Sequence, residues 1–75
     1  MKKKYIFAQE VIKKFNISYQ TLNYYTAMGL FPVAKRIGNK RVYEEEVISK
    51  RFQRIYRLAS EGYPLNLIRK KIARI

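Results

Sequence analysis

Residues 17–30, ISYQTLNYYTAMGL, decide the fold of this chain, because they predict a short helix whose outer face is rich in polar and aromatic groups. Ser18 is a favourable cap at the start of such a helix, and Gly29 is a favourable end. At 100° per residue, Leu22 and Tyr25 share one face. The opposite face carries Gln20, Asn23, Tyr24 and Ala27. Amides can pair with an adenine edge and hydroxyls can reach phosphates, although a merely solvated helix face would have the same composition.

The residues before this helix predict a first helix and a tight turn. In residues 8–15, AQEVIKKF, four apolar side chains recur at i, i+3, i+4 and i+7, as expected for one buried stripe. Asn16 tolerates the left-handed conformation in which many helices end. Two helices joined in this way, with polar groups on the second, are the outline of a helix-turn-helix that places its second helix in the DNA major groove.

A β-hairpin is predicted next. Residues 30–43, LFPVAKRIGNKRVY, contain Gly38 and Asn39, which favour a two-residue turn. That turn sets Arg36 opposite Arg41. Because opposed like charges destabilise a strand pair, the two arginines suggest that an anion such as a phosphate binds beside them. The alternatives are that both side chains extend into water, or that the register is shifted by one residue.

Two further helices complete the prediction. Residues 44–61 have a buried stripe that consists of Ile48, Phe52, Ile55 and Ala59, with Leu58 and Val47 widening it on one side. Another face carries a row of three cations, Lys50, Arg54 and Arg57. Such a row is usually just solvated, but its uniform sign favours contact with a polyanion. After Gly62, a fourth helix is predicted with the stripe Leu65, Ile68, Ile72 and Ile75. The predicted fold is mainly α with a small β-hairpin, a winged helix-turn-helix.

Composition restricts the function. The 75 residues suffice for one domain, and we expect a basic N-terminal arm at residues 1–4 and the domain at residues 5–75. The net charge of +12 indicates an anionic partner. Without Cys or His, thiolate and imidazole metal sites are excluded, and we expect no metal, no cofactor and no enzymatic activity. No apolar run approaches the ~18 residues that span a bilayer, so we expect a cytoplasmic, nucleoid-associated protein without a membrane partner.

The order of these parts resembles the DNA-binding domain of the MerR family of bacterial transcription regulators, a winged helix-turn-helix. Residues 21–30 are similar to the family motif T-L-R-Y-Y-E-x-x-G-L, and residues 62–68 to its G-[FY]-[ST]-L-x-x-I ending. The hairpin is similar to its P…R…Y-R-x-Y wing at Pro32, Arg36, Arg41 and Tyr43. The resemblance covers about residues 5–72, and the chain resembles a single-domain form without the coiled coil and the effector-sensing domain.

The resemblance implies a set of DNA-binding residues. It places Thr21 and Tyr24 of the recognition helix at the DNA, Arg36 and Arg41 at phosphates, and Tyr63 in a second wing. Together with the residue patterns above, the predicted DNA-binding set is Ser18, Gln20, Thr21, Asn23, Tyr24, Tyr25, Lys35, Arg36, Lys40, Arg41, Arg54 and Tyr63.

Several positions differ from the family pattern or have two interpretations. Asn23 stands where the pattern has arginine, so base preferences cannot be carried over. Thr26 replaces the usual acid, and Lys40 makes the wing tip more basic. The resemblance implies that Tyr43 anchors the hairpin to the core. The place of Tyr25 in the motif allows a phosphate contact, whereas helical geometry turns its ring toward the core.

The sequence therefore predicts a sequence-selective protein that binds double-stranded DNA and regulates transcription, with no evident small-molecule effector site. An alternative is an architectural or excisionase-type factor that coats or bends DNA cooperatively. Self-association of several protomers side by side on one DNA site would distinguish it from the first. An RNA-binding module ranks lower, because the stacking motifs of the common RNA-binding folds are missing. A cationic membrane-surface peptide ranks lowest, because a globular core accounts for the apolar stripes.

Overall fold

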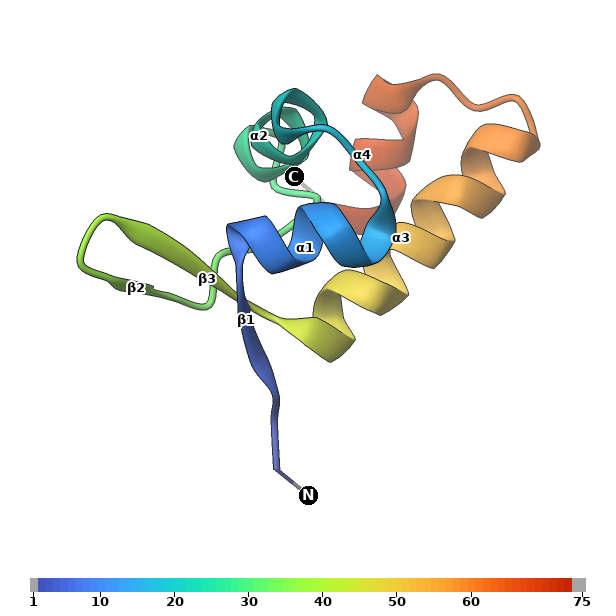
Figure 1. Ribbon diagram of the computed structural model, residues 1–75. Coiled ribbons are helices and arrows are strands. Elements are labelled where there is room, and N and C mark those ends of the chain that lie inside the picture. Colours follow the sequence, from blue (N-terminus) through green and yellow to red (C-terminus); the bar gives the residue numbers. More distant parts are fainter. Residues whose placement is uncertain (1, 74–75) are drawn as a thin grey trace.

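The computed structural model describes residues 2–73, which form four helices and a three-stranded antiparallel sheet (Figure 1). In chain order the elements are β1 (Tyr5–Phe7), α1 (Ala8–Phe15), α2 (Tyr19–Ala27), β2 (Lys35–Ile37), β3 (Lys40–Glu44), α3 (Glu45–Ser60) and α4 (Leu65–Ala73). The prediction of a mainly helical chain with a hairpin between the second and third helices, a winged helix-turn-helix, is confirmed.

The helix pair α1 and α2 forms as predicted. Val11 on the apolar stripe of α1 has no exposed surface. Asn16 ends α1 in the left-handed conformation, with φ of 54°. The hydroxyl of Ser18 caps α2 by accepting a hydrogen bond from the backbone N–H of Thr21 at 3.0 Å. Gly29 follows α2 with φ of 80°, a conformation that glycine adopts without strain.

The hairpin has the predicted register, but the sheet has one strand more than predicted. Arg36 of β2 lies opposite Arg41 of β3. On the other edge of β3, Tyr5–Phe7 pair antiparallel with residues 42–44, which gives the strand order β1-β3-β2. Three residues after a run of lysines are too few to show the alternation of a strand. The strand β1 forms because the edge of β3 provides its hydrogen-bond partners, and because Ile6 is buried in the core.

The third and fourth helices pack on the core with one change in the buried stripe. Ile48 and Ile55 of α3 are buried, and the ring of Phe52 lies 5.2 Å from that of Phe15. Ala59 was predicted to be buried but is exposed, whereas Leu58, predicted beside the stripe, packs on the core. The carbonyl of Leu58 accepts the N–H of Tyr63, so the chain turns into α4 on that flank of α3.

The remaining stripe of α4 agrees with the prediction as far as the structure describes it. Ile68 and Ile72 are buried, and Leu65 is partly buried against them. Ile75 lies outside the described residues. The N-terminal lysines continue along β3 from the start of β1. The carbonyl of Lys4 accepts the N–H of Glu45 at 2.9 Å, and Nζ of Lys3 lies 3.9 Å from the Glu44 carboxylate. The boundary between an arm and a domain after residue 4 stays a prediction.

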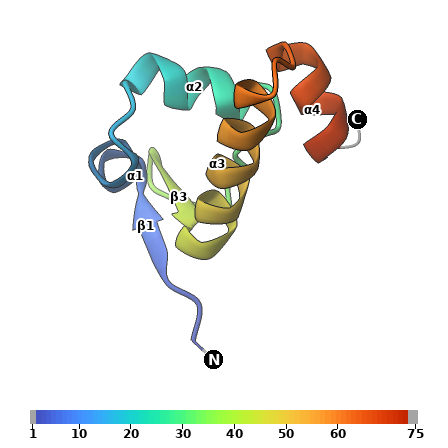
Figure 2. The ribbon, with the colours of Figure 1, turned by 90° about the vertical axis from the view of Figure 1, so that its right-hand side faces the viewer.

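The core lies where α1, α2, the sheet and the last two helices meet. In Figure 2, α2 runs along the top, with α3 and α4 on one side and α1 with the sheet on the other. Leu22 of α2 and Tyr43 of β3 are both fully buried. This shared core fixes α2 relative to the hairpin.

Candidate nucleic-acid interface

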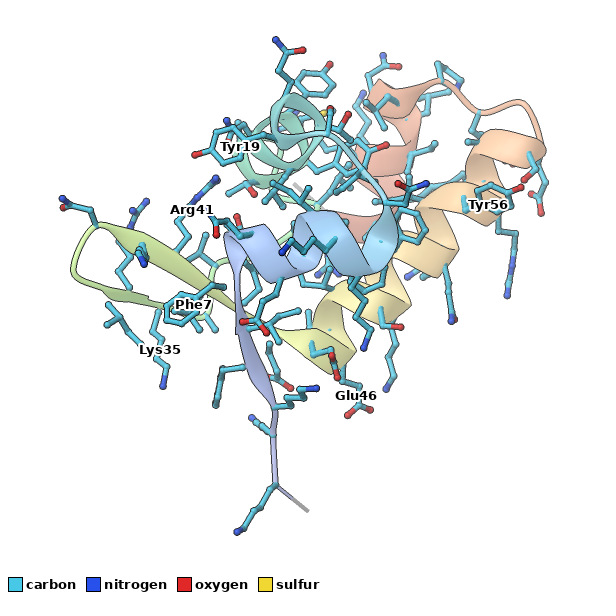
Figure 3. The ribbon with its side chains drawn as sticks, in the orientation of Figure 1. Phe7, Tyr19, Lys35, Arg41, Glu46 and Tyr56 are labelled. Atoms are coloured by element: carbon cyan, nitrogen blue, oxygen red, sulfur yellow. The ribbon has the colours of Figure 1, made fainter. Side chains whose placement is uncertain are left out.

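The two faces of the hairpin point to different surroundings. Because side chains alternate along a strand, Arg41 and Tyr43 lie on the face that looks toward α2, and Arg36 pairs with Arg41 on that face. Lys35 and Lys40 lie on the other face. Figure 3 shows this division: Arg41 points toward Tyr19 of α2, whereas Phe7 and Lys35 lie on the lower side of the hairpin.

Arg41 connects the hairpin to the recognition helix. Its Nη2 donates a hydrogen bond to Oδ1 of Asn23 in α2. Its guanidinium carbon lies 5.8 Å from the ring centroid of Tyr19 and 5.9 Å from that of Tyr43. A guanidinium group at these distances from two aromatic rings is attracted by both of them. Arg41 is therefore held by three side chains of the protein.

A second, more buried hydrogen bond connects the same two elements. The hydroxyls of Thr26 in α2 and Tyr43 in β3 lie 2.8 Å apart. The Thr26 hydroxyl also lies 2.8 Å from the Leu22 carbonyl, which can only accept, so Thr26 donates there and Tyr43 donates to Thr26. The two contacts on α2 are three residues apart and those on β3 are two apart. Each spacing keeps both contacts on one face of its element.

The exposed side of α2 carries three of the residues predicted to bind DNA. Gln20, Asn23 and Tyr24 are exposed, and 54% of the Tyr24 side chain is accessible. Tyr25 is partly buried, with its ring edge-on to that of Phe31 at 5.2 Å. The helical interpretation of Tyr25, with its ring toward the core, is therefore correct.

Ser18 and Thr21, the other two predicted residues of this segment, bond to each other in the N-terminal cap of α2. The Ser18 hydroxyl accepts the N–H of Thr21 and lies 2.9 Å from its hydroxyl. These bonds hold the first turn of α2, where free N–H groups otherwise have no helical partner. Ser18 and Thr21 thus have a structural role in the free protein, and their contact with DNA stays a prediction.

Two arginines of the later helices fix the far end of α2. Nε of Arg69 donates to the carbonyl of Met28 at 3.1 Å. Nη1 of Arg51 lies 3.5 Å from the carbonyl of Gly29 and 3.4 Å from that of Leu30. The last carbonyls of a helix lack helical partners and carry partial negative charge, so cations stabilise them. Part of the positive charge is therefore used within the protein, at the end of α2.

The lysines of the hairpin pack on aromatic rings of β1. Nζ of Lys35 lies 4.4 Å from the ring centroid of Tyr5, and Nζ of Lys40 lies 5.6 Å from that of Phe7. Val42 between them is buried although it is not part of the main core. The sequence placed the four hairpin cations in one predicted DNA-binding set, and the structure divides them between two faces.

Three of the five acidic residues lie together where β3 passes into α3, away from the hairpin tip. Within residues 2–73, the ion pairs all use Glu44, Glu45 or Glu46, whose partners are Lys3, Lys4, Lys14 and Lys50. The hydrogen bond and charge of Lys14, and the charge of Lys4, hold the pKa of the Glu45 carboxyl below its ordinary value of 4.5, although desolvation opposes this. The cations of the hairpin have no ion-pair partner in this part of the chain, so their charge is available to an anion.

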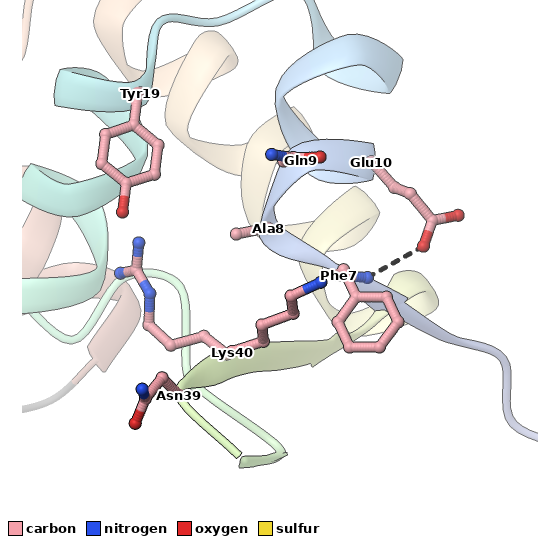
Figure 4. Close-up of a pocket in the computed structure, with 8 residues that line it drawn as sticks. Phe7, Ala8, Gln9, Glu10, Tyr19, Asn39 and Lys40 are labelled. Atoms are coloured by element: carbon pink, nitrogen blue, oxygen red, sulfur yellow. Dashed lines mark hydrogen bonds between the residues drawn. The ribbon is translucent and has the colours of Figure 1, made fainter. Parts of the chain in front are cut away.

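A hollow of about 260 Å³ lies between the hairpin, the first turn of α1 and Tyr19 (Figure 4). Tyr19 borders it on one side, and Asn39 and Lys40 border it on the other. Its remaining walls are Phe7, Ala8, Gln9, Glu10 and Arg41. The hollow thus lies between the tip of the hairpin and the first turn of α1.

The last two predicted residues lie apart from the hairpin. Arg54 is exposed on α3, and Tyr63 is partly buried in the α3–α4 loop, with Nζ of Lys71 4.9 Å from its ring centroid. Figure 1 shows α2 between the hairpin on one side and this loop on the other. A surface that includes all twelve predicted residues would therefore extend from the hairpin, over α2, to the α3–α4 loop.

Sequence reasoning missed Tyr19, which is 56% exposed and flanks Arg41. The signal was present: Tyr19 precedes Asn23 by four residues, so both lie on one side of α2.

Within residues 2–73, no cluster of acidic side chains is suited to a metal ion. No helix in this range is long and apolar enough to cross a bilayer.

The chain was compared with known proteins. The model of the family described as "MerR HTH family regulatory protein" matches residues 8–75, which is nearly the whole chain. Searches among curated proteins and among solved structures gave no match. The matched range contains α1, α2, the hairpin and both later helices, in the order that the structure shows. The chain belongs to the MerR family of helix-turn-helix regulatory proteins.

Proposed function

We propose that this protein is a sequence-selective regulator of transcription that binds double-stranded DNA in the cytoplasm, with α2 in the major groove and the hairpin against the backbone. The observation that carries the proposal is the direct connection of the exposed face of α2 to a hairpin whose arginines have no acidic partner within residues 2–73. A rigid unit of this kind can contact bases and phosphates together.

Affinity and selectivity would come from different residues. Arg36 and the cations near it would contact phosphates, which gives binding that weakens steeply as salt rises. Gln20, Asn23 and Tyr24 would face base edges, because they are exposed side chains of α2 that can donate or accept hydrogen bonds. Tyr19 is also exposed on α2, and it would flank Arg41. Tyr63 and Arg54 would contact the backbone on the other side of α2.

The test is selection of preferred sites from a random pool of duplex DNA at physiological salt, followed by sequencing. We expect an enriched motif, and we expect the motif to lose information at one position when Asn23→Ala is used. The control is Gln53→Ala, which changes an exposed amide on α3 rather than on α2. A pool without enrichment would contradict sequence-selective binding.

The same experiment distinguishes the alternatives. Salt-sensitive binding to duplex without enrichment would favour an architectural factor, and several protomers side by side on one duplex would support cooperative coating. Tighter binding to single-stranded RNA than to duplex DNA would favour the RNA-binding alternative. Inverted or direct repeats in an enriched motif would indicate how protomers associate on DNA.

A further inference from the structure

The hydrogen bond between Arg41 and Asn23 fixes the orientation of the Asn23 side-chain amide. A guanidinium group has five N–H donors and no acceptor, so only the carbonyl oxygen of an amide can face it. The hydrogen bond from Arg41 to Oδ1 of Asn23 therefore turns Nδ2, which has two donors, away from Arg41. The free Asn23 side chain would have two amide orientations, and Arg41 selects one of them.

We infer that Arg41 is a positioning residue for Asn23, and that the pair reads a base edge that offers a hydrogen-bond acceptor and rejects cytosine. The inference rests on the proposed function. In the major groove, guanine, adenine and thymine each present at least one acceptor, whereas cytosine presents the N4 amino donor. Nδ2 of the held amide and the remaining N–H groups of Arg41 are all donors. Opposite the N4 amino group of cytosine, which is also a donor, they cannot form a hydrogen bond.

The surroundings of Arg41 support this role over a simple phosphate contact. Arg41 is only partly exposed, and its guanidinium lies near the rings of Tyr19 and Tyr43. Arg36 lies directly opposite on the same face of the hairpin and is exposed. Within residues 2–73, no hydrogen bond or ion pair engages the Arg36 side chain. The hairpin thus offers two arginines of equal charge, of which one is held against α2.

The first test compares Arg41→Met with Arg36→Met, a matched control that removes the same charge from the same face. The probe is the selected duplex, with each of the four bases placed in turn at the position where Asn23→Ala flattens the preference. We expect the wild-type protein to bind the cytosine duplex weakest, by about fivefold or more. Arg41→Met should remove most of this discrimination, whereas Arg36→Met should weaken binding to all four duplexes by the same factor.

A second variant tests the direction of the amide without touching Arg41. Asn23→Asp keeps an acceptor for Arg41 and replaces the donor group by a second acceptor. Because carboxylates accept from cytosine N4, the order of preference should shift toward cytosine, even if the added negative charge weakens binding to every duplex. Circular dichroism and the thermal midpoint of each variant confirm that it is folded before its base profile is measured.

The outcomes separate the inference from the proposed function. If the wild-type protein enriches no motif, the proposed function fails. If a motif is enriched but Arg41→Met and Arg36→Met change the base profile equally, the positioning role of Arg41 is wrong while the proposed function stands. An unchanged order of bases in Asn23→Asp, or a motif in which no position responds to Asn23→Ala, overturns the inference as well.

Discussion

The two faces of the hairpin carry two cations each and use them differently. On the face toward α2, Arg41 bonds to the recognition helix, and Arg36 beside it is unengaged within residues 2–73. On the outer face, Lys35 and Lys40 lie over the rings of Tyr5 and Phe7. Arginine suits the first task because its planar fork can bond to an amide and keep further donors, whereas the flexible lysine stem covers apolar surface. Charge alone therefore does not tell which face of the hairpin would contact an anion.

The largest expected effect is on stability, and it compares the buried residues of the two hairpin faces, Tyr43 toward α2 and Val42 on the outer face. Tyr43→Ala should destabilise the protein by about 3–5 kcal/mol, because it empties a fully buried site and removes the bond to Thr26. Val42→Ala should cost about 1.5 kcal/mol, because only two carbons are lost from the outer face. Urea denaturation followed by circular dichroism measures both. Equal losses would show that the outer face is as important for stability as the face toward α2.

The second prediction compares the free cations of the two faces in DNA binding. Arg36→Met should lower the magnitude of the slope of log K against log salt by about 0.9, the value for one phosphate contact. Lys35→Met should change this slope by less than half as much, since Lys35 lies on the outer face against Tyr5. Fluorescence anisotropy at several salt concentrations measures the slopes. A larger change for Lys35→Met would place the DNA on the outer face.

A smaller effect isolates the polar bond between α2 and β3. Tyr43→Phe should destabilise the protein by about 1 kcal/mol, because the hydroxyl of Tyr43 donates to Thr26 in a partly buried setting. Tyr24→Phe is the matched control, since its hydroxyl lies on a side chain that is 54% exposed. Thermal unfolding of the two variants gives the difference. If both variants unfold like the wild-type protein, the bond does not contribute to holding α2.

The smallest effect concerns the acidic end of the molecule. Because the Glu45 pKa is lowered in the folded protein, the unfolded chain takes up the proton more readily. The contribution of Glu45 to stability is therefore complete above pH 4.5 and is lost as the pH falls through the lowered pKa. Lys14→Met should make unfolding less dependent on pH in this range, whereas Lys13→Met should not. A pH series of urea midpoints measures this, and identical curves for the two variants would exclude the Lys14 contact as the cause.

Much of the fold was predictable because it depends on neighbours in sequence. The bounds of α1 follow from the spacing of Ala8, Val11, Ile12 and Phe15, and the start of α2 follows from the Ser18 cap. The hairpin register follows from the turn at Gly38 and Asn39. Ala59 was placed wrongly because helical spacing does not tell which flank of a stripe the next helix covers.

The site was predictable as a set of residues but not as an arrangement. Asn23 and Arg41 were each predicted to bind DNA, while the bond between them was not. Tyr19 was missed because its importance arises from Arg41, which is far away in the sequence. The pairing of Thr26 with Tyr43 was unforeseen for the same reason.

The sequence by itself determined the helices, the hairpin and its register, the family and the strong positive charge, since periodicity, turn residues and composition are local or additive properties. Only the tertiary structure decided that β1 joins the sheet, that α2 lies over one face of the hairpin, and that Arg41 meets Asn23. These features depend on how a shared core around Leu22 and Tyr43 brings α2 and β3 together. Such contacts join residues that no local pattern relates.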